Sequence, residues 1–125
     1  AILGPLRDFD AAEDWLRRAE VIGVEPWTCL EWAMLYTLQD RHADAEKSAR
    51  RALELRPWYR PAVQWVAHFL VQKERDQEAL DLLTEATRRL ESGAVYGQLA
   101  NLQIELKRYD DAVHSLNEFE RLSPL

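Results

Sequence analysis

Apolar residues along the chain recur at the spacing of a single helix face. Val63, Val66, Ala67 and Leu70 follow the pattern i, i+3, i+4, i+7. No stretch keeps the alternation of apolar and polar residues that is typical of a strand. Gly23 and Gly93 suit helix ends, and Pro26 and Pro61 suit first helical turns. The pattern predicts helices over residues 9–22, 26–39, 43–55, 60–73, 76–90, 94–106 and 109–122.

A small residue recurs through the chain with a period of about 34 residues. Its four occurrences are Ala12, Ala45, Ala79 and Ala112. A second series with the same period is Ala33, Ala67 and Ala100. A fixed period of this length indicates two-helix units that stack, because one such unit cannot bury its apolar face alone. We expect the alanines at the places where the two helices of a unit cross at the shortest distance.

The unit at residues 93–125 has the clearest set of repeat residues, namely Tyr96, Leu99, Ala100, Ala112, Leu116, Phe119 and Pro124. These residues and their period resemble the tetratricopeptide repeat family, whose unit is a helix–turn–helix of about 34 residues. The resemblance implies an all-α fold, a right-handed superhelix of antiparallel helix pairs. It divides a single domain, residues 1–125, into about three and a half repeats: 1–25, 26–59, 60–92 and 93–125.

The sequence departs from the family pattern at the turn between the two helices of each unit. Asp40, Glu74 and Lys107 stand where the family has glycine. The chain also begins without methionine, and we expect it to be a piece of a longer protein.

Composition and charge exclude some classes of function. Sixteen lysine and arginine residues against 22 aspartate and glutamate residues give a net charge of −6. Nucleic-acid affinity depends on excess positive charge, so nucleic acid is not an expected partner. No run of 18 apolar residues occurs, which predicts no membrane span. The compartment is unknown from the sequence, with the cytoplasm favoured.

The residues that could carry chemistry are few and scattered. Cys29 lies one turn before Trp32 on the core side of its helix, which predicts a buried, inert thiol. The histidines His42, His68 and His114 lie in different repeats, without the spacing of metal ligands. Glycine-rich phosphate loops are absent from the sequence. We therefore expect no catalytic, cofactor-binding or metal site, and no enzymatic activity.

A group of arginines allows two interpretations. Arg50, Arg51, Arg56 and Arg60 cluster around one helix end and could form a basic patch for phosphate or an acidic partner. The favoured interpretation is a solvated face held by ion pairs between residues four apart on a helix. The pairs predicted in this way are Glu13–Arg17, Glu46–Arg50 and Glu85–Arg89.

The resemblance implies that the first helix of each repeat lines a concave surface. The candidate partner-binding residues on these helices are Trp27, Leu30, Met34, Leu38, Gln64, Trp65, His68, Gln72, Asn101 and Glu105. On the first of these helices, the candidates are apolar where a solvated face would carry charged residues. Exposed apolar surface of this kind is typical of an interaction site. The predicted function is a protein–protein interaction module that presents an apolar and aromatic groove to a peptide or helix.

Other interpretations stay open. The apolar face could be covered by helices that precede residue 1 or by tight superhelical curvature. The chain could also be a structural scaffold of a larger protein, or it could self-associate through the helix at 109–122, where Val113, Leu116, Phe119 and Leu122 have no following unit to cover them. A helical RNA-binding repeat is the least favoured, because of the net negative charge.

Overall fold

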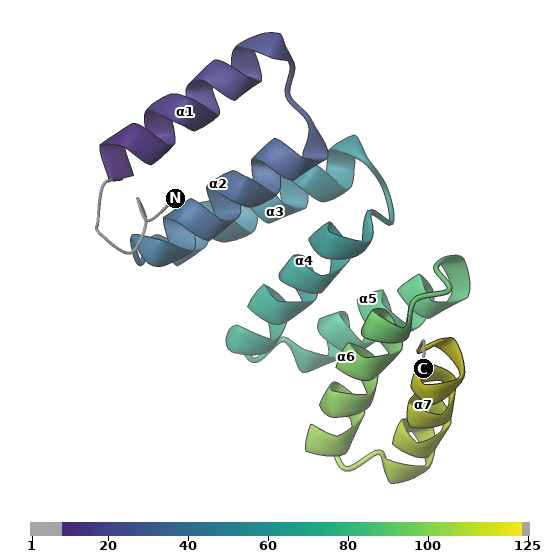
Figure 1. Cartoon of the computed structure of the whole chain (residues 1–125). Helices are drawn as coiled ribbons and strands as arrows, with labels where there is room; N and C mark the ends of the chain where they lie inside the picture. Colours follow the sequence, from purple (N-terminus) through teal and green to yellow (C-terminus); the bar gives the residue numbers. More distant parts are fainter. Residues whose placement is uncertain (1–8, 124–125) are drawn as a thin grey trace. The chain divides into compact units, whose positions relative to one another are not determined.

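The computed structural model describes residues 9–123, which form helices joined by short turns, with no strand in that range (Figure 1). The helices are α1 (Phe9–Ile22), α2 (Pro26–Leu38), α3 (His42–Leu55), α4 (Arg60–Gln72), α5 (Asp76–Arg89), α6 (Gly93–Glu105) and α7 (Tyr109–Leu122). The predicted helices are confirmed, and every boundary agrees to within one residue. Pro124, part of the repeat pattern, lies outside the described residues. The chain divides into two compact units, residues 1–62 and 63–125, and each is described by itself.

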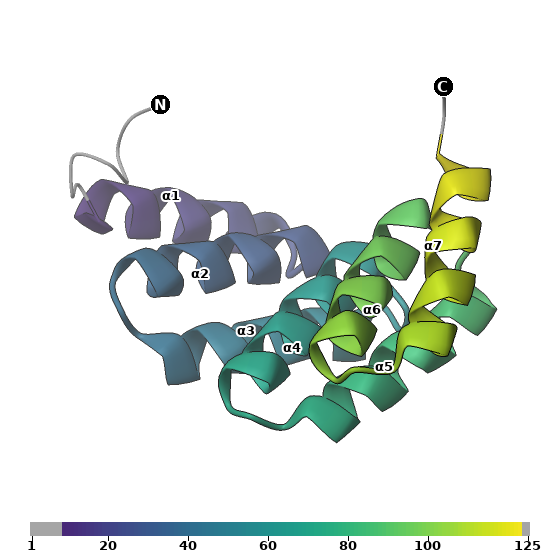
Figure 2. The same cartoon turned by 90° about the horizontal axis from the view of Figure 1, so that it is seen from below.

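In the first unit, α2 packs against both α1 and α3, and Figure 2 shows it between them. The core combines larger apolar side chains with alanines. It contains Leu16, Cys29, Leu30, Ala33, Leu35, Ala45, Ala49 and Ala52. The alanines have no exposed surface, which lets the α2 and α3 backbones approach closely. The repeated alanines of these two helices therefore lie at the helix contact, as the sequence predicts.

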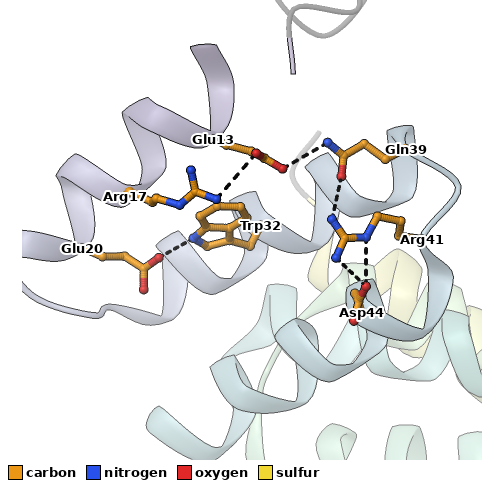
Figure 3. Close-up of polar contacts among 7 residues, drawn as sticks. All are labelled: Glu13, Arg17, Glu20, Trp32, Gln39, Arg41 and Asp44. Carbon is orange, nitrogen blue, oxygen red and sulfur yellow. Dashed lines mark hydrogen bonds and ion pairs between the residues drawn. The ribbon is translucent and has the colours of Figure 1, made fainter. Parts of the chain in front are cut away.

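Polar side chains join α1 to α2 (Figure 3). The indole Nε1 of Trp32 donates a hydrogen bond to the carboxylate of Glu20, and the Arg17 guanidinium lies 5.9 Å from the centre of the Trp32 ring. At the other end of the contact, Gln39 Nε2 donates to Glu13 Oε1 at 3.3 Å. Within the described residues α1 buries only Leu16, so these directional contacts contribute to fixing its position on α2.

In the second unit, α6 packs against both α5 and α7. The core of this unit again combines branched apolar side chains with alanines. They include Val63, Val66, Ala67, Leu70, Ala79, Leu80, Leu83, Ala86, Val95, Leu99, Ala100 and Ala112. Every repeat alanine of this unit is at most 2% exposed. The repeat period thus places the same small side chain at the same helix contact in successive repeats.

The turns within the repeats keep the backbone conformation of glycine although the glycine is absent. Asp40, Glu74 and Lys107 have φ angles of 59°, 61° and 61°. At the first turn, the Arg41 N–H donates to the Tyr36 carbonyl at 2.8 Å and the Asp40 N–H to the Thr37 carbonyl at 3.1 Å. The other two turns repeat both hydrogen bonds. This is the Schellman arrangement that ends a helix through one left-handed residue.

We expect Lys107→Gly to raise the free energy of unfolding by about 0.5–1 kcal/mol. The left-handed conformation costs a residue with a Cβ roughly 1–2 kcal/mol, part of which the greater freedom of glycine in the unfolded chain offsets. The matched control is Lys47→Gly on the exposed face of α3, which should lower stability by about 1 kcal/mol. Urea denaturation followed by circular dichroism measures both. A loss of stability in Lys107→Gly would contradict the strain at this turn.

The turn between α3 and α4 has a different design. The Tyr59 N–H donates to the Arg56 carbonyl at 3.1 Å, and Trp58 between them has a φ of 61°. Pro57 precedes it, as is common in a type II turn, whose third residue is normally glycine. A tryptophan in this conformation is strained, because its Cβ crowds the backbone.

Candidate functional site

A pocket of about 710 Å³ opens in the second unit, formed by α4, α6 and α7. Its lining residues are Gln64, Trp65, His68, Ala94, Gly97, Gln98, Asn101, Leu116 and Phe119. We call it the amide–aromatic pocket. Its polar groups are three carboxamides and an imidazole, and none of its lining side chains is an aspartate, glutamate, lysine or arginine. The pocket is therefore suited to hydrogen bonding and apolar contact rather than to ion pairing.

The aromatic wall of this pocket is held by the core beneath it. Trp65 stacks on Phe69 with ring centres 5.6 Å apart, and Phe69 is buried. The ring of His68 meets Trp65 edge-on, with centres 6.3 Å apart. Trp65 itself is only partly buried. A partner would thus meet an indole that is already held in place, so binding need not order a free side chain.

On the α7 side of the pocket, the ring of Phe119 lies against the backbone of α6 at Gly97. A Cβ at position 97 would lie 3.2 Å from Cδ1 and 3.3 Å from Cε1 of Phe119. The absence of a side chain at Gly97 therefore lets α7 place an aromatic ring close to α6. Phe119 still exposes 40% of its surface, and it is available to a partner.

The carboxamide of Gln98 supplies the most specific polar group of the pocket. Its Nε2 donates a hydrogen bond to the main-chain carbonyl of Gln64 at 3.1 Å and so links α6 to α4. Its Oε1 is buried and accepts no hydrogen bond from the described residues. A buried carbonyl oxygen without a donor costs roughly 1–3 kcal/mol.

Four of the ten predicted binding residues line this pocket, namely Gln64, Trp65, His68 and Asn101. Gln72 and Glu105 are exposed but do not line it. In the first unit, the structure places three predicted residues on the exposed surface of α2: Trp27, Met34 and Leu38. Leu30 is 8% exposed and belongs to the core instead, because it lies one turn before Ala33 on the same side of the helix.

The first unit has its own smaller apolar hollow, of about 460 Å³, at the end of α1. Trp15 and Trp27 line it with ring centres 6.4 Å apart, and Ile22, which is 92% exposed, lies beside them. The sequence predicts Trp27 as a binding residue but neither Trp15 nor Ile22, because the family resemblance assigns the concave surface to the first helix of each repeat.

The family resemblance also leaves out the α7 part of the amide–aromatic pocket. Leu116 and Phe119 line the pocket, but both belong to the second helix of their repeat. A signal was available in the sequence, since Val113, Leu116 and Phe119 were recognised there as apolar residues without a following helix to cover them. Leu116 and Phe119 are exposed on this face of α7 and also line the pocket.

The remaining chemical predictions can be compared with the structure. Cys29 is buried as predicted, and burial raises the pKa of its thiol, an effect that the charge of Arg51 partly opposes.

The predicted ion pairs Glu13–Arg17, Glu46–Arg50 and Glu85–Arg89 are confirmed, with nitrogen–oxygen distances of 3.6, 2.9 and 3.1 Å. Over residues 9–123, no helix has the length and apolarity to cross a membrane, and no three histidine, cysteine, aspartate or glutamate side chains gather as metal ligands.

Comparison with known proteins gives one family match. Residues 93–124, which contain α6 and α7, match the tetratricopeptide repeat family. A search of curated proteins finds no match to the sequence. Tetratricopeptide repeats are typically non-catalytic protein-interaction or scaffold modules, and the match supports that general role. Residues 93–124 are therefore similar to a tetratricopeptide repeat, and the helices of residues 9–123 are consistent with a helical repeat of this kind.

Proposed function

We propose that the chain binds a segment of a partner protein in the amide–aromatic pocket. The observation that carries the proposal is the pair of accessible aromatic rings that line the pocket. Trp65 is partly buried and stacks on the buried Phe69, and Phe119 is 40% exposed. Aromatic side chains that are held in place and still accessible are favoured contact residues at protein interfaces.

The chemistry of the lining residues defines the partner segment. Trp65 and Phe119 offer aromatic surface, and Asn101 and His68 offer hydrogen-bonding groups. Burying one large apolar side chain contributes roughly 1.5–3 kcal/mol, against an association cost of about 4–15 kcal/mol. Two or three such contacts contribute about 3–9 kcal/mol, which offsets only the lower part of that cost. Hydrogen bonds to the pocket, at about 0.5–1.5 kcal/mol each, are needed in addition to bring the affinity into the micromolar range. Because the lining carries no aspartate, glutamate, lysine or arginine, affinity for uncharged segments should change little with salt.

Selection of peptides from a displayed random library on the full chain tests this proposal. We expect uncharged segments with an aromatic residue to bind with micromolar affinity by fluorescence polarisation. Trp65→Ala should weaken them at least tenfold, roughly the loss of one buried aromatic contact. Asn101→Ala should weaken them less, because its side chain is exposed.

The matched control is Tyr109→Ala, which removes an exposed aromatic side chain of α7 that does not line the pocket. It should leave the affinity unchanged, and all three variants should keep the thermal unfolding curve of the parent chain to within a few degrees. Equal binding by Trp65→Ala and the parent chain would refute the proposal.

A further inference from the structure

Trp65 brings a hydrogen-bond donor as well as an aromatic ring to the amide–aromatic pocket. Its indole N–H has no acceptor among the described residues, whereas the indole of Trp32 donates to Glu20. The Trp65 ring is held in place by its stacking on Phe69. The carboxamide of Asn101, which also lines the pocket, is exposed and makes no hydrogen bond within the described part of the chain. The pocket therefore offers N–H donors from both α4 and α6, and each suits a carbonyl oxygen as acceptor.

The conformation of a ligand decides whether its main-chain carbonyl oxygens are available to these donors. In an α-helix, each carbonyl accepts from the N–H four residues later, so a helical ligand offers almost none along its length. In a polyproline II helix no internal hydrogen bonds form, and every carbonyl can accept. The two donors therefore favour an extended ligand of this second kind over an α-helix.

Other common ways of holding an extended peptide do not fit the pocket. Addition of a strand requires an exposed sheet edge, and the described residues contain no strand. Recognition of an acidic or phosphorylated motif requires a cluster of arginines, and the lining has no arginine or lysine. Aromatic-lined grooves are instead typical of the recognition of proline-rich segments.

The free energy of association also favours a ligand that is already ordered. Two or three apolar contacts offset only the lower part of the cost of association, so a ligand that must in addition be ordered would bind weakly. Proline fixes φ, and a proline-rich segment holds the polyproline II conformation before it binds. Because this helix has three residues per turn, prolines three positions apart lie on one face, where they can pack on the ring of Trp65.

We propose that the ligand of the amide–aromatic pocket is an uncharged, proline-rich segment of a partner protein in the polyproline II conformation. Its pyrrolidine rings pack on Trp65, and its carbonyl oxygens accept from the indole N–H of Trp65 and from the carboxamide of Asn101. This inference rests on the proposed function and goes further by giving the conformation and the residue type of the partner segment. Both donors lie on the first helices of their repeats, so the contact does not depend on what packs against the exposed face of α7.

Two capped, uncharged peptides of about ten residues, each with one tyrosine, test the proposal on the full chain. One peptide has proline at every third position, and the other has alanine at those positions. In fluorescence polarisation the proline peptide should bind about tenfold more tightly, since each proline reduces the conformational entropy that the free peptide loses on binding. Its affinity should change by less than about twofold between low salt and 0.5 M salt.

A conservative variant separates the indole N–H from the ring. Trp65→Phe keeps an aromatic ring and removes the donor, so it should weaken binding of the proline peptide about threefold to tenfold, the loss of one hydrogen bond. In nuclear magnetic resonance spectra of the parent chain, the indole N–H signal that this variant lacks should shift when the proline peptide is added. The matched control is Trp27→Phe, at an exposed position of α2 outside the pocket. It should leave the affinity unchanged, and the signal that it removes should not respond to the peptide.

The outcomes distinguish this inference from the proposed function. Equal or tighter binding of the alanine peptide would overturn the inference, and would leave the proposed pocket standing if that binding requires Trp65. An affinity that Trp65→Phe does not change, together with an indole signal that does not shift, would also overturn it. So would a dimer in analytical ultracentrifugation that Trp65→Ala dissociates, because a second copy of the chain would then be the occupant. If binding of the designed peptides and of the library peptides is independent of Trp65, the proposed function itself fails.

Discussion

Replacing Leu83 with alanine is expected to lower the free energy of unfolding by about 2–5 kcal/mol. Leu83 is 1% exposed and lies on the face of α5 that α6 covers. Its removal takes three carbon atoms out of the core and leaves a cavity, because the rigid helices around it can close only in part. Urea denaturation followed by far-ultraviolet circular dichroism measures the loss.

The same substitution one repeat later gives the control. Leu116→Ala removes an identical side chain from the equivalent position of α7, where 43% of the side chain is exposed. Its cost should stay below about 1 kcal/mol, because much of the leucine is already in contact with water. Equal losses for the two variants would show that α6 does not protect Leu83 as described.

Replacing Ser115 with alanine is expected to cost about 1–3 kcal/mol, although only one oxygen atom is lost. The Ser115 hydroxyl donates to Oε1 of Gln103 at 2.7 Å, and both residues are buried between α6 and α7. The variant would leave a buried amide oxygen without this donor, and the loss of that hydrogen bond is dominated by the desolvation of the remaining partner. The shift in the urea midpoint measures the loss.

A double-mutant cycle separates this effect from packing. In the previous repeat the position of Gln103 is occupied by Leu70, which is buried, so the fold accepts an apolar side chain there. Gln103→Leu/Ser115→Ala should therefore be less destabilised than the sum of the two single variants, by about 1 kcal/mol. Additive losses would argue against a coupled pair. Ser48→Ala, at the equivalent, partly buried position of α3, should change stability by no more than about 0.5 kcal/mol.

The sequence predicts the helices to within one residue because local and long-range signals agree. Each helix has an apolar stripe with the period of an α-helix, and the same stripe returns in each repeat, so every repeat supports the assignment of the others. The alanine series also predicts where the helices meet, as the complete burial of Ala33, Ala67 and Ala100 confirms.

The binding site is less predictable, since it depends on which faces are covered. Gln64, Trp65, His68 and Asn101 could be assigned from their place on the first helices. The sequence does not tell that Leu30 is buried and Met34 exposed. Both lie on the same helix, and a small rotation of that helix about its axis decides whether a side chain lies in the core or on the surface. The sequence predicts Phe119 as an uncovered apolar residue of its helix, but its place in the pocket depends on its contact with Gly97, which no spacing along one helix encodes.

Backbone conformation in the turns is the least predictable feature. Asp40, Glu74 and Lys107 could be aligned with the family's glycine, and that alignment does indicate the left-handed region. Trp58 has no such signal, because an aromatic residue rarely adopts a positive φ and no repeat offers a comparison. Its conformation follows from the hydrogen bond that closes the turn after Pro57.

The three Schellman turns have a consequence for the kinetics of folding. Each turn ends one helix and starts the next through hydrogen bonds between residues close in sequence. The helices that it joins, α6 and α7 for example, then meet through near neighbours along the chain, such as Gln103 and Ser115. Structures dominated by such local contacts fold quickly, and repeat proteins can nucleate at more than one place. Each helical hairpin can therefore serve as its own starting point, and the order in which the hairpins form depends on their individual stabilities.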